Sequence, residues 1–261
     1  MTPLRISLLQ TDIAWEEKPK NLCRLREMLE TLRGKTELAI LPETFTTGFS
    51  MNPASVAEPI DGETISTLKQ WASTYGIALA GSYIACTPSS EHCNRAFFLT
   101  PEGEAHYYDK HHLFRIGHET EHYSPGNERP IINFRGWNIL LLICYDLRFP
   151  VWSRNRNNEY DLLIYVANWP AARRKVWDTL LQARALENIS YVCGVNRIGK
   201  TPQDIAHDGG SAVYSYKGTQ LALVPDNTEG IATVTLDYNL LQEFRQKFPA
   251  WKDADDFSIK L

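Results

Sequence analysis

Residues 140–150 read LLLICYDLRFP, a run of aliphatic residues that ends at Cys144 and turns at once into charge. Consecutive apolar positions of this kind are typical of a strand that is covered on both faces. Similar apolar runs recur at residues 5–10, 37–41, 77–83, 96–100, 161–167 and 191–196. Amphipathic patterns of helical period lie between them at residues 21–33, 64–76 and 176–188. This alternation predicts an α/β protein in which helices are layered on a central sheet.

The domain organisation follows from length and punctuation. A chain of 261 residues allows one large domain or two ordinary ones. No linker rich in Pro, Gly or Ser and no clear internal repeat divides it, so we expect a single domain over residues 1–261. The last segment, residues 237–261, is amphipathic and then aromatic and acidic. Because it has no obvious place in a finished layer structure, we expect it to pack against a second subunit.

Composition excludes several classes of partner. Lys and Arg number 27 against 31 Asp and Glu, a net charge of -4, so there is no basic field for nucleic acid or an anionic membrane. No stretch approaches the roughly 20 apolar residues of a membrane span, and the start lacks a signal-peptide pattern. Five cysteines without a CxxC pair argue against a disulfide framework and a zinc site, and nucleotide-binding glycine motifs are absent. We therefore expect a cytoplasmic protein with reduced thiols, no cofactor and a small-molecule partner.

Three predicted strands end in reactive residues. Glu43 follows the apolar run at 37–41, Lys110 follows a short aromatic strand, and Cys144 ends the run quoted above. Ligands bind at the carboxyl ends of strands in α/β sheets, so these three ends could converge on one pocket. A free cysteine has a pKa of about 8.5 and needs a base or a cation to become an effective nucleophile. Glu43 suits the base, and Lys110 suits an oxyanion donor together with the peptide N–H of Tyr145.

Each of these residues also has a purely structural reading. A single cysteine in an apolar strand is often a small core residue. Glu43 could be an acid at a helix N-terminus, and Lys110 could lie in a solvated loop beside two histidines. The histidines at 111, 112, 118, 122 and 207 lack a well-spaced set of carboxylates, so a metal site is a weaker reading than packed or solvated histidines. Residue types and spacing alone leave these alternatives open.

At these residues the sequence resembles the nitrilase superfamily of carbon–nitrogen hydrolases. The segment LPETFTTGF is similar to the glutamate motif of that family, YDKHHLF to its lysine motif and CYDLRFP to its cysteine motif. The segments ETEHYSPG, ANWPAARRKVWDTLLQARALEN and DGGSAVYSYKG continue the likeness in the same order. The resemblance therefore covers nearly the whole chain, and within the family it is nearest to the bacterial omega-amidase branch.

The resemblance implies a role for each motif residue. Cys144 would be the nucleophile, Glu43 the general base, Lys110 the oxyanion donor, and Glu119 the second glutamate that orients them. It implies an α-β-β-α sandwich that dimerises into an α-β-β-α-α-β-β-α homodimer. The implied activity is hydrolysis of the terminal amide of small 2-oxo dicarboxylic acid monoamides, such as 2-oxoglutaramate or succinamate, through a cysteine thioester.

Such a substrate carries a carboxylate remote from the amide, and a guanidinium is the natural partner for it. We expect Arg173 in this role, ahead of its neighbour Arg174. Arg148 is expected to be structural, held by Asp146 or a neighbouring loop, although the reverse assignment stays open.

Phe49 and Trp169 are expected to wall the acyl chain, with a place in the core as the alternative for either. Rival functions are an N-carbamoyl amino acid hydrolase, a deaminated-glutathione amidase or a nitrilase. A metal-dependent hydrolase that uses the histidine loop, or a non-catalytic binding protein of the same fold, is less favoured.

Overall fold

The computed structural model describes residues 2–258 and contains two six-stranded sheets. The first sheet has the strand order β14-β1-β2-β3-β4-β5. Its strands are β1 (Leu4–Gln10), β2 (Leu38–Ile40), β3 (Ala78–Cys86), β4 (His92–Leu99), β5 (Ala105–Asp109) and β14 (Gly230–Leu236). The three innermost strands, β1, β2 and β3, run parallel, and antiparallel strands extend the sheet on both sides.

The second sheet repeats this plan, with the order β13-β12-β9-β8-β7-β6. Its strands are β6 (Ile131–Phe134), β7 (Trp137–Ile143), β8 (Leu162–Ala167), β9 (Tyr191–Asn196), β12 (Ala212–Tyr214) and β13 (Gln220–Leu223). Strands β7, β8 and β9 are parallel. A separate hairpin joins β10 (Ile198–Lys200) to β11 (Ala206–Asp208). The apolar residues 140–143 therefore belong to β7, which pairs with β6 on one side and β8 on the other.

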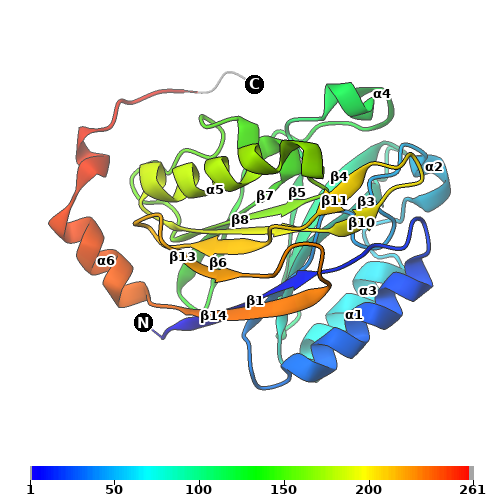
Figure 1. The fold of residues 1–261 in the computed structure, drawn as a ribbon, viewed down its shortest axis with the longest axis horizontal. Coiled ribbons are helices and arrows are strands. Elements are labelled where there is room, and N and C mark those ends of the chain that lie inside the picture. The colour runs from blue at the N-terminus through cyan, green and yellow to red at the C-terminus, as the bar shows by residue number, and fades with distance from the viewer. Residues whose placement is uncertain (1, 259–261) are drawn as a thin grey trace.

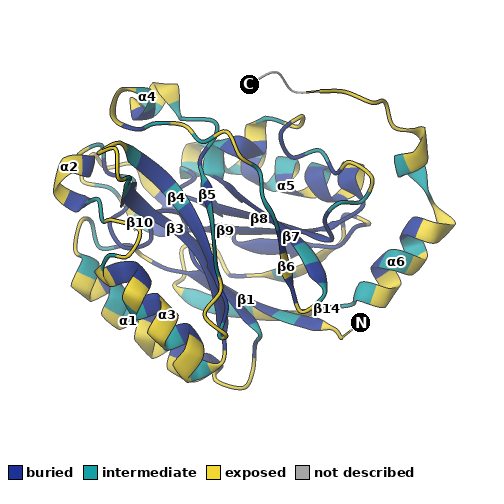
Figure 2. Ribbon diagram, turned by 180° about the vertical axis from the view of Figure 1, so that it is seen from behind, coloured by how far each residue is buried: buried dark blue, intermediate teal, exposed yellow. Residues whose placement is uncertain are grey.

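Helices cover the outer face of each sheet (Figure 1). The first sheet is covered by α1 (Lys18–Leu32) and α3 (Glu63–Tyr75), and the second by α5 (Arg174–Asn188). The shorter elements are α2 (Pro53–Val56), α4 (Glu119–His122), α6 (Tyr238–Lys247) and the 3₁₀ turns η1 (Arg115–Gly117), η2 (Cys144–Arg148), η3 (Ala171–Arg173) and η4 (Ala250–Asp253). The layer order is thus α-β-β-α, as the family resemblance implied. Figure 2 shows the buried strands enclosed between helices whose outer faces are exposed.

The core explains why the strands are apolar on consecutive positions. In β1, Ile6 and Leu8 face the second sheet, whereas Leu9 faces helices α1 and α3. In β2, Leu38 and Ile40 also face the second sheet, and Ala39 faces the helices. Successive side chains of a strand point to opposite faces, so a strand between two apolar layers needs apolar residues on both. The expectation of a single central sheet was wrong, because the same pattern serves a strand that faces a helix layer or a second sheet.

The C-terminal segment lies apart from the layers. Helix α6 extends from one edge of the sandwich, and the residues after it turn back towards the layers (Figure 1), where the Arg156 guanidinium lies 6.0 Å from the Phe257 ring. The helix is fixed by Arg245, which is buried and donates to Asp161 Oδ1 at 2.7 Å and to the carbonyl oxygens of Tyr160 and Ile189. Residues 259–261 of the predicted 237–261 segment lie outside the described residues. No helix within residues 2–258 is both long and apolar enough to cross a lipid bilayer.

Candidate active site

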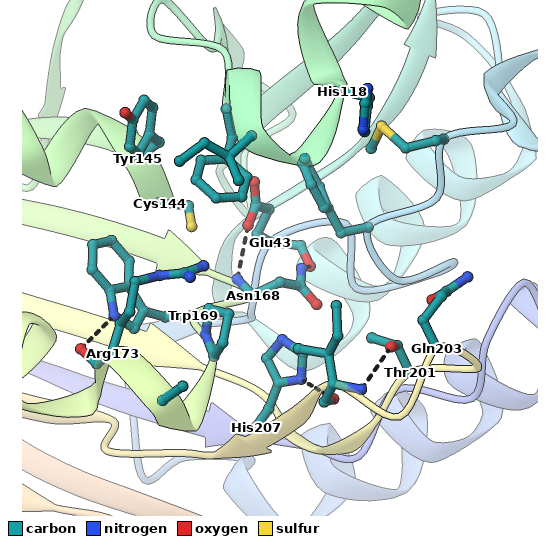
Figure 3. Close-up of a pocket in the computed structure, with 18 of the residues that line it drawn as sticks. Glu43, His118, Cys144, Tyr145, Asn168, Trp169, Arg173, Thr201, Gln203 and His207 are labelled. Carbon is teal, nitrogen blue, oxygen red and sulfur yellow. Dashed lines mark hydrogen bonds between the residues drawn. The ribbon is translucent and has the colours of Figure 1, made fainter.

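The three reactive strand ends predicted from the sequence meet at one cavity, where Figure 3 shows Glu43 and Cys144. Glu43 follows β2, Lys110 follows β5 and Cys144 follows β7, so two of them come from the first sheet and the third from the second. Lys110 Nζ donates to Glu43 Oε1 at 2.9 Å, and both side chains are about 1% exposed. No helix begins at Glu43 and Lys110 is not solvated, so both structural alternatives are wrong.

Cys144 occupies a sharp junction between β7 and the 3₁₀ turn η2. Its φ of 42° lies in the left-handed region, which a non-glycine residue rarely adopts and which is typical of strained functional positions. Burial raises the pKa of the Cys144 thiol well above its ordinary value, the adjacent Glu43 carboxylate adds to that rise, and Lys110 opposes it. The resting sulfur is therefore a thiol that needs a base, and Glu43 is the carboxylate beside it.

Lys110 is held between two carboxylates. Its ammonium lies 2.9 Å from Glu119 Oε2 as well as 2.9 Å from Glu43 Oε1. Burial alone lowers the pKa of Lys110, but Glu119 and Glu43 outweigh burial and raise it, so the ammonium stays charged. Burial raises the pKa of Glu119, and Lys110 offsets this only in part. The predicted second glutamate is thus in direct contact with Lys110.

Two asparagines that the sequence analysis did not single out hold Glu43 in place. Asn94 Nδ2 donates to Glu43 Oε1 at 2.7 Å and to Glu119 Oε1 at 3.3 Å. The backbone N–H of Asn168 donates to Glu43 Oε2 at 2.7 Å, and its side-chain amide donates to the Glu43 carbonyl at 2.6 Å. Both are buried, in β4 and just after β8. Their only sequence signal was a polar residue inside or directly after an apolar run.

Asp146 ties the lysine loop to the cysteine turn. It is fully buried, and its Oδ1 accepts hydrogen bonds from the backbone N–H of His112 at 3.0 Å and from the ring Nδ1 at 2.8 Å. Its Oδ2 accepts from Tyr108 at 2.7 Å and from the Ile143 N–H at 3.0 Å. Asp146 therefore braces the turn that carries Cys144 against the lysine loop. It does not pair with Arg148, whose guanidinium lines the cavity and lies 5.4 Å from the ring of Trp169, so of the two partners expected for Arg148 the structure shows the neighbouring loop.

A cavity of about 760 Å³ opens above this cluster. Phe49 lines it and lies over Lys110, with the ammonium 4.9 Å from the ring centre. Trp169 also lines it and donates its indole N–H to the Arg173 carbonyl at 2.9 Å. Arg173 faces the same cavity, whereas Arg174 points away and pairs with Asp178, Asp208 and Asp226. The structure therefore places Phe49, Trp169 and Arg173 where the sequence analysis expected substrate contacts.

The histidines do not gather into a metal site. His111 stacks on Trp152 and His112 on Phe149, which makes both part of the packing around Asp146. His207 is buried in the cavity wall (Figure 3), and its Nδ1 lies 3.1 Å from the carbonyl oxygen of Ile205. Within residues 2–258, no group of three or more His, Cys, Asp or Glu side chains is arranged to hold a metal ion.

Comparison with known proteins shows the family of the chain. The family model described as carbon-nitrogen hydrolase matches residues 5–246. The chain belongs to the carbon-nitrogen hydrolase family. A protein of this family named omega-amidase YafV, from Escherichia coli strain K12, is 42% identical over 99% of this chain and all of its own length. Another, the 2-oxoglutaramate amidase of Bacillus subtilis strain 168, is 30% identical over 95% of this chain and 96% of its own.

A solved member of the family has the same fold. The crystal structure of XC1258 from Xanthomonas campestris, described with an arsenic adduct in its active site, superimposes with a TM-score of 0.96 at 40% identity. The superposition covers the whole of this chain and the whole of XC1258. The predicted family and α-β-β-α fold are therefore confirmed, and the protein is an amide-cleaving hydrolase of the carbon-nitrogen hydrolase family.

Proposed function

We propose that this hydrolase removes the terminal amide of small 2-oxo dicarboxylic acid monoamides, such as 2-oxoglutaramate, and also accepts succinamate-like amides. The observation that carries the proposal is the buried cluster of Glu43, Lys110 and Cys144 at the floor of a cavity that also contains Arg173. The names of the omega-amidase and 2-oxoglutaramate amidase relatives support the same substrate class. No cofactor enters the proposed chemistry.

The first half-reaction acylates the enzyme. Glu43 accepts the Cys144 proton as the sulfur attacks the amide carbon, and Lys110 with the Tyr145 N–H stabilises the tetrahedral oxyanion. The C–N bond then breaks, and Glu43 returns the proton to the departing nitrogen, which leaves as ammonia. Glu119 keeps Lys110 charged and in place during both steps, because its carboxylate lies 2.9 Å from the ammonium.

The second half-reaction releases the acid. Glu43, again a carboxylate, takes a proton from water as its oxygen attacks the thioester carbonyl, and Lys110 holds the second oxyanion. The C–S bond breaks, the thiolate regains the proton from Glu43, and the carboxylic acid departs. Asn94 and the backbone of Asn168 keep the carboxylate of Glu43 in one orientation through both half-reactions, since each donates to a different oxygen.

The carboxylate remote from the amide is bound by Arg173 in this proposal. Its guanidinium lies 5.3 Å from the Phe114 ring centre at the cavity wall, and no acidic side chain within residues 2–258 forms an ion pair with it. A guanidinium suits a planar carboxylate because it can donate two parallel hydrogen bonds. Phe49 and Trp169 supply apolar walls for the methylene chain between the two ends.

The test is release of ammonia across a panel of matched compounds. We expect turnover of 2-oxoglutaramate and succinamate at a kcat/KM far above that of N-carbamoyl amino acids, nitriles and peptide-like amides. Carbon dioxide released from an N-carbamoyl amino acid would instead indicate the carbamoylase alternative. Preference for the deaminated glutathione tripeptide would contradict the proposed substrate size.

We also propose that the protein is a cytoplasmic homodimer and that its single domain, residues 1–261, uses the segment 237–261 in the subunit contact. Leu240 and Phe248 of this segment are about half exposed, at 52% and 56%, which is unusual for large apolar side chains on one short segment. All five cysteines are free, which supports a reducing compartment. Sedimentation at several concentrations tests the dimer, and a chain truncated after residue 236 should sediment as a monomer.

A further inference from the structure

The cavity carries an excess of positive charge that the proposed catalytic residues do not use. Its lining includes Lys110, Arg148 and Arg173 but, among the described residues, Glu43 as the sole carboxylate. Lys110 already pairs with Glu43 and with Glu119 behind it. Within residues 2–258, two guanidinium groups therefore remain without an acidic partner, in a protein whose net charge is -4.

Both arginines come from neighbouring strand ends. Arg148 ends the turn η2 after β7, and Arg173 ends the turn η3 after β8. Strands β7 and β8 are adjacent and parallel, with Ile143 opposite Val166 in the last register pair, so the two turns emerge side by side at the cavity. The carboxyl ends of two adjacent parallel strands thus deliver one guanidinium each to the same space.

Each of the two guanidinium groups lies over an aromatic ring. Arg148 lies over the Trp169 ring at 5.4 Å, and Arg173 lies over the Phe114 ring at 5.3 Å. A ring face favours a nearby cation without neutralising it, so each guanidinium keeps hydrogen-bond donors for another group. Arg174 shows the contrast, because it is the next residue after Arg173 and is paired with Asp178 and Asp226.

Two like charges that face one cavity repel each other unless an anion lies between them. We propose that Arg148 is a second substrate-binding residue, and that Arg148 and Arg173 form a two-guanidinium clamp for the carboxylate head of the substrate. This inference rests on the proposed function, because it assigns a second contact to the anionic end of the proposed amide. It makes the cavity selective for small amides with an anionic far end over neutral amides of the same length.

The experiment measures anion binding without turnover. Iodoacetamide alkylates Cys144, the modified peptide is quantified by mass spectrometry, and glutarate, an unreactive five-carbon dicarboxylate, is added at constant ionic strength. We expect glutarate to protect Cys144 in the wild type. We expect Arg148→Gln and Arg173→Gln each to weaken that protection about 10- to 100-fold, the range for losing a hydrogen bond to a charged group. Protection of Arg148→Lys should be intermediate, because lysine keeps the positive charge but cannot donate two parallel hydrogen bonds to one carboxylate.

The matched control is Arg135→Gln. Arg135 also lies over an aromatic ring, that of Phe134 at 5.5 Å, but it is exposed on the β6–β7 turn outside the cavity. Its loss should leave glutarate protection unchanged. Unchanged protection in Arg148→Gln beside a loss in Arg173→Gln would overturn the clamp and leave the proposed function standing. Intact protection in the wild type with no ammonia release from 2-oxoglutaramate would support the clamp and contradict the proposed substrate.

Discussion

Replacing His207 with glutamine should remove part of the acid sensitivity of the fold. His207 is 5% exposed in the cavity wall, and Arg197 lies near enough to disfavour a second positive charge. Burial first, and Arg197 second, lower the pKa of His207 from 6.5 to about 4. The native state therefore keeps a neutral imidazole at pH values where the unfolded chain binds a proton.

The sign and size of the effect follow by linkage. Above the pKa of the unfolded state, the imidazole is neutral in both states and does not change the free energy of unfolding. As the pH falls from about 6.5 towards about 4, the unfolded state gains a proton that the native state refuses, so the free energy of unfolding decreases. For a shift of this size the loss is about 2 kcal/mol by about pH 5 and approaches 3 kcal/mol near pH 4.

Urea unfolding at about pH 8 and about pH 5 measures this difference for the wild type and for His207→Gln. The variant should lose about 2 kcal/mol less than the wild type between the two pH values, whatever its stability at the higher one. His118→Gln is the control, because the His118 side chain is 68% exposed. If the wild type and His207→Gln lose the same free energy, His207 is not held neutral by burial and the reasoning fails.

Three further changes test the site and the core. Cys144→Ala should lower kcat by at least about 10³-fold, with ammonia release as the measurement; ordinary turnover would exclude the proposed nucleophile. Asn94→Leu removes a donor to Glu43 and should lower kcat about 10- to 100-fold with little change in KM, and a normal kcat would show that Glu43 needs no such support. In Gly194→Ala the new Cβ would lie 2.5 Å from a packed leucine, so the free energy of unfolding should fall by about 1–3 kcal/mol in urea. Gly230→Ala, whose nearest neighbour is at 3.6 Å, should be nearly neutral, and equal losses would refute the packing argument.

The sequence could predict elements whose pattern is local. The helices at 21–33, 64–76 and 176–188 correspond to α1, α3 and α5, and Gly76 ends α3 with a φ of 67°, as a left-handed C-cap requires. The number of sheets depends on which distant strands pair, so local patterns could not predict it. Strand β14 was not predicted, and its antiparallel pairing with β1 joins the two ends of the chain, which no local pattern indicates.

The site residues likewise fall into those with a local signal in the sequence and those without one. Glu43, Lys110 and Cys144 were found because each reactive residue ends an apolar run, and the family resemblance supplied Glu119 and the order of the motifs. Asn94 was missed because an asparagine inside a strand carries no hint of which carboxylates it will contact. Proximity in sequence suggested Asp146 as one partner of Arg148, but the oxygens of Asp146 accept hydrogen bonds from Tyr108 of β5, His112 of the lysine loop and Ile143 of β7 instead.

The division of the site between two sheets sets when activity can appear. The sheet that carries Cys144 contains no strand beyond residue 223, but the sheet that carries Glu43 and Lys110 is closed by β14, residues 230–236, against β1 at the other end of the chain. Pairing of segments so distant in sequence is a late and slow event in folding. The carboxylate of Glu43 is held by Asn94 of the first sheet and by Asn168, which follows β8 of the second. During refolding, the onset of ammonia release therefore reports that both sheets have formed and packed together, rather than the formation of the strand that bears the sulfur.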